Sequence, residues 1–209
     1  LEFDETLGTS DVLYDLAFLL MDLRHAGLPR AANIALNSYL FHAPGTDHYA
    51  GLSLLPLFLS IRAAIRAMVN VQTARLNSED PALLPEARKY LSYALGYLAP
   101  APAQLIAIGG LSGTGKTALA TSLSPQIGTA PGAVHLRSDL ERKMLFGVPP
   151  LTRLPPSAYA ADINKRVYDV MLDKADAVLR AGHSVVLDAT WLNEGERKSL
   201  NALAERVGV

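Results

Sequence analysis

The sequence predicts an α/β fold with a parallel sheet in residues 101–209, preceded by an all-helical segment in residues 1–100. Two observations predict this division. Helical periodicity dominates the first hundred residues, whereas short apolar runs alternate with helical stretches after them. Between the two regions, Pro100-Ala101-Pro102 forms a short stiff linker, which is typical of a domain boundary. We therefore expect two domains that meet at this linker.

Four helices are expected in the first domain: 12–25, 29–40, 49–76, and one from a cap at Ser78 or Asp80 to about residue 99. Asp11 is a favourable capping residue for the first helix, and Gly27 stands where a glycine commonly ends one. Pro29 suits the first position of the second helix. Pro56 predicts that the third helix is bent or begins nearby.

The second domain is expected to alternate between strands at 105–109, 133–137 and 184–189 and helices at 116–123, 139–146, 157–180 and 194–206. Ser157 is the predicted cap of the long helix, and Gly182 is expected to end it. Alternation of this kind predicts βαβ units and a parallel sheet. Because three strands make a small sheet of this type, we expect this domain to be truncated at its C-terminus and the first domain at its N-terminus.

Composition narrows the class of partner. Half of the 209 residues are apolar, 19% are charged, and the formal net charge is −1, so no overall field favours nucleic acid or an anionic membrane. The absence of cysteine excludes disulfides, thiolate–zinc sites and cysteine catalysis, and it is compatible with a reducing cytosol. Within the most apolar stretch, 52–69, Arg62 and Arg66 lie one turn apart, which favours an amphipathic helix over a membrane span. We therefore expect a cytoplasmic protein with no membrane partner.

The strongest motif is Gly110-Leu111-Ser112-Gly113-Thr114-Gly115-Lys116-Thr117, which fits G-x-x-x-x-G-K-[ST] at every defined position. A predicted strand precedes it and a predicted helix follows it, so the glycines fall at a strand-to-helix turn. Backbone N–H groups in such a loop, together with the positive end of the helix dipole, suit a polyphosphate. The alternative is a glycine-rich turn with an incidental lysine. The sequence thus predicts a nucleoside triphosphate site over residues 110–118, with Ala118 as its last member.

Three side chains are predicted to handle phosphate and metal. Lys116 is expected to reach the β- and γ-phosphates, and the Thr117 hydroxyl is expected to bind Mg²⁺. Asp188 ends the apolar strand 184–189, at the position of a second carboxylate on the metal side. The alternative for Asp188 is a carboxylate that only caps the following turn.

A further pair distinguishes a kinase from a plain ATPase. Asp139 and Arg142 follow the second predicted strand, at the edge of a parallel sheet where ligands bind. Asp139 can accept the proton of an attacking hydroxyl, and Arg142, one turn further, can hold the acceptor or the transferring group. The alternative is that Ser138 or Asp139 caps the helix and that Arg142 is solvated.

These segments resemble a known group of enzymes. The loop 110–117, Arg137-Ser138-Asp139 with Arg142, and Val185-Val186-Leu187-Asp188-Ala189-Thr190 are similar to the phosphate-loop kinases related to polynucleotide kinase, gluconokinase and zeta toxin. In polynucleotide-kinase-like enzymes an Asp-x-x-Arg provides the general base and an acceptor-contacting arginine, and this chain matches that spacing. The resemblance implies a P-loop NTPase fold that uses ATP and Mg²⁺. The lid arginine and adenine-contacting segment of such kinases are expected beyond the end of this sequence.

The first domain carries a second resemblance. Leu1-Glu2-Phe3-Asp4 followed by residues 11–19 looks like the C-terminal half of aminoglycoside-phosphotransferase-like kinases. The catalytic loop of those kinases would stand upstream of Leu1, so none of their catalytic residues carries over. The order of domains resembles bacterial bifunctional proteins that join such a phosphotransferase to an ATP-binding domain. The resemblance implies a partial phosphotransferase-like lobe over 1–100 and a partial P-loop kinase domain over 101–209.

We therefore expect ATP-dependent phosphoryl transfer to a hydroxyl of a small molecule or nucleotide. One alternative is a regulatory module, in which nucleotide binding or hydrolysis only biases the attached lobe. Another is that the helical lobe belongs to an antibiotic kinase. The acceptor stays open, because Asp-x-x-Arg occurs in kinases of sugars, nucleic-acid ends and other hydroxyls.

Other polar residues are interpreted more simply. His135 lies in a predicted strand and His183 in a turn, and both are expected to be structural. Lys165 and Arg166, near the start of the long helix, are candidates for contact with an acceptor phosphate.

Overall fold

The computed structural model describes residues 11–43, 47–76 and 82–209. In the first part of the chain the helices are α2 (Val12–His25), α3 (Pro29–His42), α4 (Asp47–Gly51), a 3-10 helix (Leu52–Leu54), α5 (Leu55–Leu76) and α6 (Leu83–Tyr97). Asp11 caps α2 as predicted, since its carboxylate accepts a hydrogen bond from the Leu13 N–H at 2.9 Å. Pro29 is the first residue of α3. The predicted cap at Ser78 or Asp80 lies outside the described residues.

The long third helix starts earlier than predicted. It begins at Asp47, passes through the 3-10 helix and continues as α5, whose second residue is Pro56. A proline fits there because the first N–H groups of a helix have no partner within it. By length and composition alone, the helical run Asp47–Leu76 could cross a membrane, and a third of its most apolar window is buried. Two of its arginines pair with acidic residues of α2: Arg62 with Asp15 at 3.0 Å and Arg66 with Asp22 at 2.7 Å.

The second part of the chain alternates as predicted. Its elements are β1 (Leu105–Ile108), α7 (Lys116–Leu123), a 3-10 helix (Ser124–Gln126), β2 (Val134–Arg137), α8 (Ser138–Leu145), a 3-10 helix (Pro156–Tyr159), α9 (Ala161–Arg180), β3 (Val185–Asp188) and α10 (Glu194–Val207). The predicted cap at Ser157 is wrong. Pro155 and Pro156 start a separate 3-10 turn that contains Ser157, and α9 begins four residues later with no side-chain cap.

The three described strands form a parallel sheet in the order β1-β3-β2. Ile108 and Arg137 both pair with Asp188, so the carboxyl ends of all three strands meet at one edge. Side chains alternate across the sheet. Val186 packs on one face with Ala120 of α7, whereas Leu187 belongs to the opposite face, which α9 covers. The central strand is therefore buried on both faces, which explains its uninterrupted apolar run.

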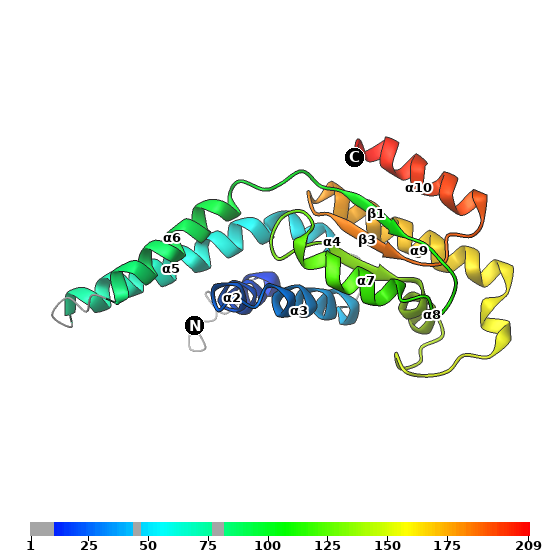
Figure 1. Ribbon diagram of the computed structural model, residues 1–209, viewed down its shortest axis with the longest axis horizontal. Coiled ribbons are helices and arrows are strands. Elements are labelled where there is room, and N and C mark those ends of the chain that lie inside the picture. Colours follow the sequence, from blue (N-terminus) through cyan, green and yellow to red (C-terminus); the bar gives the residue numbers. More distant parts are fainter. Residues whose placement is uncertain (1–10, 44–46, 77–81) are drawn as a thin grey trace.

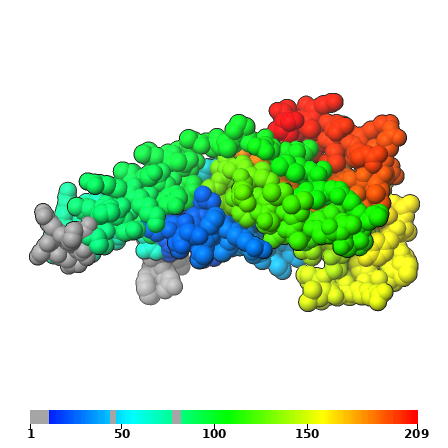
Figure 2. Space-filling model, in the orientation of Figure 1, coloured from blue at the N-terminus to red at the C-terminus, as the bar shows by residue number. Residues whose placement is uncertain are grey.

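One hydrophobic core joins the two parts of the chain. Leu36 of α3, Leu59 of α5 and Leu187 of β3 belong to the same buried cluster. His183, 1% exposed, bonds the Leu52 carbonyl through Nε2 at 2.9 Å and adds a polar contact between them. Among the described elements, α5 and α6 extend away as a pair of helices that projects from the rest (Figure 1). Figure 2 shows the same arm at one end of the molecular surface.

Candidate phosphate-binding and acceptor site

The glycine-rich loop joins β1 to α7, as its motif predicts. Gly110, Gly113 and Gly115 all have positive φ angles, of 143°, 81° and 86°. Residues with a Cβ rarely adopt these angles. A Cβ at Gly110 would also lie 3.2 Å from the Thr114 hydroxyl oxygen. The glycines are therefore needed for the shape of this loop, of which Ser112 and Gly113 line a cavity at the start of α7.

The lysine and threonine of the motif hold the loop together. Lys116 Nζ donates to the Leu111 carbonyl at 2.7 Å, and the Thr114 hydroxyl donates to the same oxygen at 2.8 Å. The Gly110 N–H bonds the Thr190 carbonyl at 3.1 Å and ties the loop to the segment after β3. The Lys116 ammonium thus already lies across the loop, where it can meet an anion.

Thr117 and Asp188 come together at the carboxyl edge of the sheet. The Thr117 hydroxyl donates to Asp188 Oδ2 at 2.6 Å, and Asp188 is only 5% exposed. Burial raises the pKa of Asp188, but its contacts with His135 and Thr117 and the charge of Arg137 lower it by more, so it lies below the ordinary value. Asp188 is therefore a buried, ionised carboxylate. A hydroxyl and a carboxylate are hard oxygen donors, the type that Mg²⁺ prefers.

A cavity of about 590 Å³ brings most of the predicted site residues together. Those in its lining are Ser112, Gly113, Lys116, Thr117, Asp139, Arg142 and Asp188. Gly110, Leu111, Thr114, Gly115 and Ala118 belong to the loop and the start of α7 but are not among the lining residues. The loop and the Asp-x-x-Arg pair, which come from different βα connections, therefore face one space.

The structure contradicts the capping alternative for Asp139. The residue before α8 is Arg137, and no side chain caps this helix. Asp139 lies inside the first turn, where its carboxylate pairs with Lys143 at 3.0 Å and lines the cavity. Lys143 also donates to the Pro150 carbonyl, so it connects Asp139 to the proline-rich loop after α8.

The solvated alternative for Arg142 is also wrong. Arg142 is 5% exposed, and its Nη1 donates to the Ala158 carbonyl at 2.7 Å. Its guanidinium carbon lies 4.7 Å from the centre of the Tyr159 ring, within cation–π distance. The 3-10 turn that displaced the predicted helix start is thus the element that holds this arginine in place.

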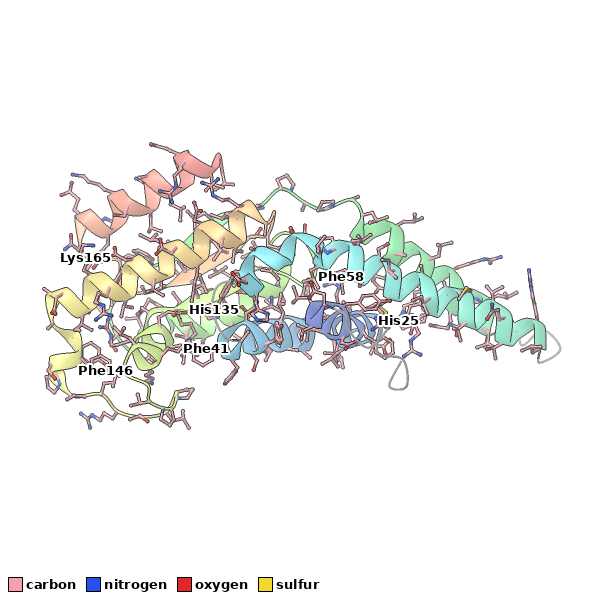
Figure 3. The ribbon with its side chains drawn as sticks, turned by 180° about the vertical axis from the view of Figure 1, so that it is seen from behind. His25, Phe41, Phe58, His135, Phe146 and Lys165 are labelled. Carbon is pink, nitrogen blue, oxygen red and sulfur yellow. The ribbon has the colours of Figure 1, made fainter. Side chains whose placement is uncertain are left out.

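Four cavity residues were not singled out from the sequence: Tyr159, Asn164, Tyr168 and Glu196. Four others belong to the motif segments but were given no binding role: Arg137, Ser138, Ala189 and Thr190. By contrast, Lys165 and Arg166 are not in the lining, and Lys165 pairs with Asp169 at 2.6 Å. Figure 3 shows Lys165 at the end of the molecule furthest from the α5–α6 arm.

His135 has a position that its strand pattern did not indicate. Its Nε2 lies 3.5 Å from Asp188 Oδ2, and both side chains are buried. Among the described residues no group of three or more His, Cys, Asp or Glu side chains is arranged to hold a metal ion. A cation at this site would therefore depend on Thr117, Asp188 and oxygens of a bound nucleotide.

The comparisons with known proteins agree with this geometry. The AAA domain family matches residues 105–209. An uncharacterized protein of Mycobacterium bovis and uncharacterized proteins of two strains of Mycobacterium tuberculosis are each 31% identical over 98% of this chain. The chain spans about 40% of the length of these relatives. No solved structure matches it significantly.

The match begins at the first residue of β1 and includes the whole phosphate loop, the Asp-x-x-Arg pair and Asp188. It supports a nucleotide-binding P-loop domain, and nothing in it points to an aminoglycoside-phosphotransferase-like segment. Through residues 105–209, the chain belongs to the AAA domain family.

Proposed function

We propose that this site binds ATP with Mg²⁺ and transfers the γ-phosphoryl group to a hydroxyl of a small molecule or nucleotide. One observation carries the proposal. The phosphate loop with Lys116, the Thr117–Asp188 pair, and Asp139 with Arg142 line the same cavity. A plain ATPase needs the first two sets, whereas a buried arginine and a carboxylate from another βα connection in the same cavity suit a second substrate.

The residues fit the groups that the reaction requires. Gly113 and Gly115 have no atom within 4 Å of an added Cβ, so the space beside these two glycines is open. The Thr117 hydroxyl has lone pairs free while it donates to Asp188. When bound, Mg²⁺ would neutralise part of the negative charge of the phosphates. In this assignment Lys116 holds the β- and γ-phosphates, and Thr117 and Asp188 hold the metal.

In the transfer step Asp139 accepts the proton of the acceptor hydroxyl while Arg142 orients the acceptor. The acceptor oxygen forms a bond to the γ-phosphorus, the bond from that phosphorus to the β–γ bridging oxygen breaks, and ADP leaves. Positioning and charge stabilisation provide most of the acceleration in such reactions. Lys143 forms an ion pair with Asp139, and this pair must weaken when the Asp139 carboxylate takes up the proton.

We also propose that residues 1–100 form a phosphotransferase-like lobe and residues 101–209 the kinase domain of a longer cytoplasmic protein. The second candidate function is a regulatory ATPase, in which nucleotide binding or hydrolysis changes the conformation of this lobe. The continuous core between the two parts favours it, because a change in one part is transmitted to the other through packed side chains.

Two variants test the proposal and separate its candidates. Lys116→Ala is expected to abolish ATP binding by calorimetry, and unchanged affinity would refute the nucleotide site. Asp139→Asn is expected to bind ATP normally but to lose phosphorylation of acceptors in a screen of sugars, nucleosides and other hydroxyl compounds with radiolabelled ATP. If the unaltered protein hydrolyses ATP and phosphorylates no acceptor, the regulatory reading replaces the kinase.

A further inference from the structure

Helix α3 lies along the outer edge of β2 and bonds it with side-chain amides. Asn37 Oδ1 accepts a hydrogen bond from the His135 N–H at 2.6 Å. The Nδ2 groups of Asn33 and Asn37 donate to the Ala133 carbonyl at 3.0 and 3.3 Å. These amides take the donor and acceptor positions that a neighbouring strand would offer. The backbone of His135 is therefore fixed from the helical part of the chain.

The side chain of His135 connects this edge to Asp188. Its Nε2 lies 3.5 Å from Asp188 Oδ2, the oxygen that also accepts the Thr117 hydroxyl. The Nε2 atom is buried and makes no well-aligned hydrogen bond to any described residue. Buried polar atoms nearly always have a polar partner, and the contact that supplies one for Nε2 is its 3.5 Å approach to the Asp188 carboxylate. Figure 3 labels His135 and Phe41 of α3, which line a common cavity beside β2.

We infer that His135 is a positioning residue for Asp188, and that Asn37 of α3 holds His135 in place for this task. The inference rests on the proposed function, in which Asp188 serves the metal. Asp188 has two described side-chain partners for Oδ2, and Thr117 is itself a proposed metal ligand. His135 is thus the partner that can fix the carboxylate without engaging the metal. Such outer partners commonly set the orientation of a ligand.

This arrangement gives the helical segment a direct connection to the metal side of the site. The path has three steps: Asn37 to the backbone of His135, the imidazole to Asp188, and Asp188 to Thr117. Arg137 is a further charged group near Asp188, and it lies on β2, the strand that also carries His135. Loss of the imidazole should therefore weaken Mg²⁺ binding while the phosphate loop keeps its hold on the nucleotide.

The test compares ATP binding to the whole chain in Mg²⁺ and in EDTA. His135→Leu keeps much of the volume and removes the imidazole nitrogens, whereas His135→Gln can return an N–H near the position of Nε2. Removal of an outer partner typically lowers metal affinity about 10–100-fold. For His135→Leu we expect the Mg²⁺ concentration that gives half-maximal enhancement to rise by at least about tenfold, with ATP affinity in EDTA within about threefold of the original. His135→Gln should recover most of the loss.

A second buried histidine provides the matched control. His183 also bonds across to the helical segment, but its partner is the Leu52 carbonyl and not a residue of the proposed metal site. His183→Leu should lower the melting temperature without changing the Mg²⁺ dependence. Asn37→Ala should move the Mg²⁺ midpoint in the same direction as His135→Leu, by about threefold or more, because it releases the strand backbone. This second variant carries the test if His135→Leu does not fold.

Calorimetry reports the affinities, and the single tryptophan, Trp191, gives an independent signal because it follows β3 three residues after Asp188. The inference is overturned if His135→Leu or Asn37→Ala leaves the Mg²⁺ midpoint within twofold, or if His183→Leu shifts it equally. Failure of the proposed function looks different: Lys116→Ala would then bind ATP as well as the unaltered protein, whatever residue stands at 135.

Discussion

The ion pair between Glu141 and Lys174 anchors helix α8, and its removal should measure how firmly the acceptor side is held. Lys174 Nζ lies 2.8 Å from both carboxylate oxygens of Glu141. The two side chains are only 8% and 5% exposed. Glu141 stands on the same helix as Asp139 and Arg142, so a displacement of α8 would move both of these site residues. The perturbation that we choose is Lys174→Met, which keeps the length of the side chain and removes its charge.

The magnitude follows from burial. Lys174→Met leaves a carboxylate inside the protein without its cation, and breaking a buried pair in this way costs about 3–5 kcal/mol. At roughly 2–4 °C per kcal/mol for a chain of this size, the melting temperature should fall by about 6–20 °C. Replacement of both partners, as in Glu141→Leu with Lys174→Met, should recover most of this loss, because an apolar pair of similar volume leaves no charge buried.

The assay is reversible denaturant unfolding followed by circular dichroism, performed on both single variants and the double variant. We expect each single variant to be less stable than the double variant. Lys165→Met is the control, because its pair with Asp169 is exposed and contributes little. A Lys174→Met variant within 1 kcal/mol of the unaltered protein, or a double variant that is the least stable of the three, would refute the reasoning.

Three further outcomes are expected. Gly132→Ala should lose several kcal/mol of stability in denaturant unfolding, because the φ of Gly132 is 110° and a Cβ there would lie 2.4 Å from the Ser124 carbonyl oxygen. Gly182→Ala should lose only about 1–2 kcal/mol, because Gly182 has a φ of 80° but open space around an added Cβ. Burial lowers the pKa of His183 below 6.5, so stability should fall as the pH drops below that value, and His183→Leu should lose less between pH 7.5 and 5.5 in melting experiments. Thr117→Ala should weaken Mg²⁺-dependent ATP binding while leaving binding in EDTA nearly intact.

The sequence predicted most helices and strands well because capping residues and the spacing of apolar residues determine where such elements form. Asp11 caps α2, and the strand at 185–188 reads as a buried run because both of its faces are covered. The glycine-rich loop was placed correctly between β1 and α7, since the positive φ angles of Gly110, Gly113 and Gly115 are a local requirement that the motif itself records. Ser157 was misassigned because two prolines start a competing turn, whose preference outweighs that of a capping serine.

Contacts between distant segments could not be predicted in the same way. Asn37 and His135 are 98 residues apart, and nothing in either pattern indicates that one bonds the other. The same holds for the burial of Arg142, which depends on a carbonyl and a ring supplied by the turn sixteen residues later. The roles of Lys116, Asp139, Arg142 and Asp188 stay predictions that binding and activity measurements must test.

The amides that α3 places against β2 also bear on how this protein can be handled. An outer strand with free N–H and C=O groups is a template on which other chains assemble. Here Asn33 and Asn37 occupy that template, and α3 brings Leu36 into the core beneath it. A polypeptide cut at the Pro100 linker would lose this cover together with the apolar side chains that complete the core. The part that matches the AAA domain should then self-associate during expression, and the two parts should be soluble only when produced as one chain.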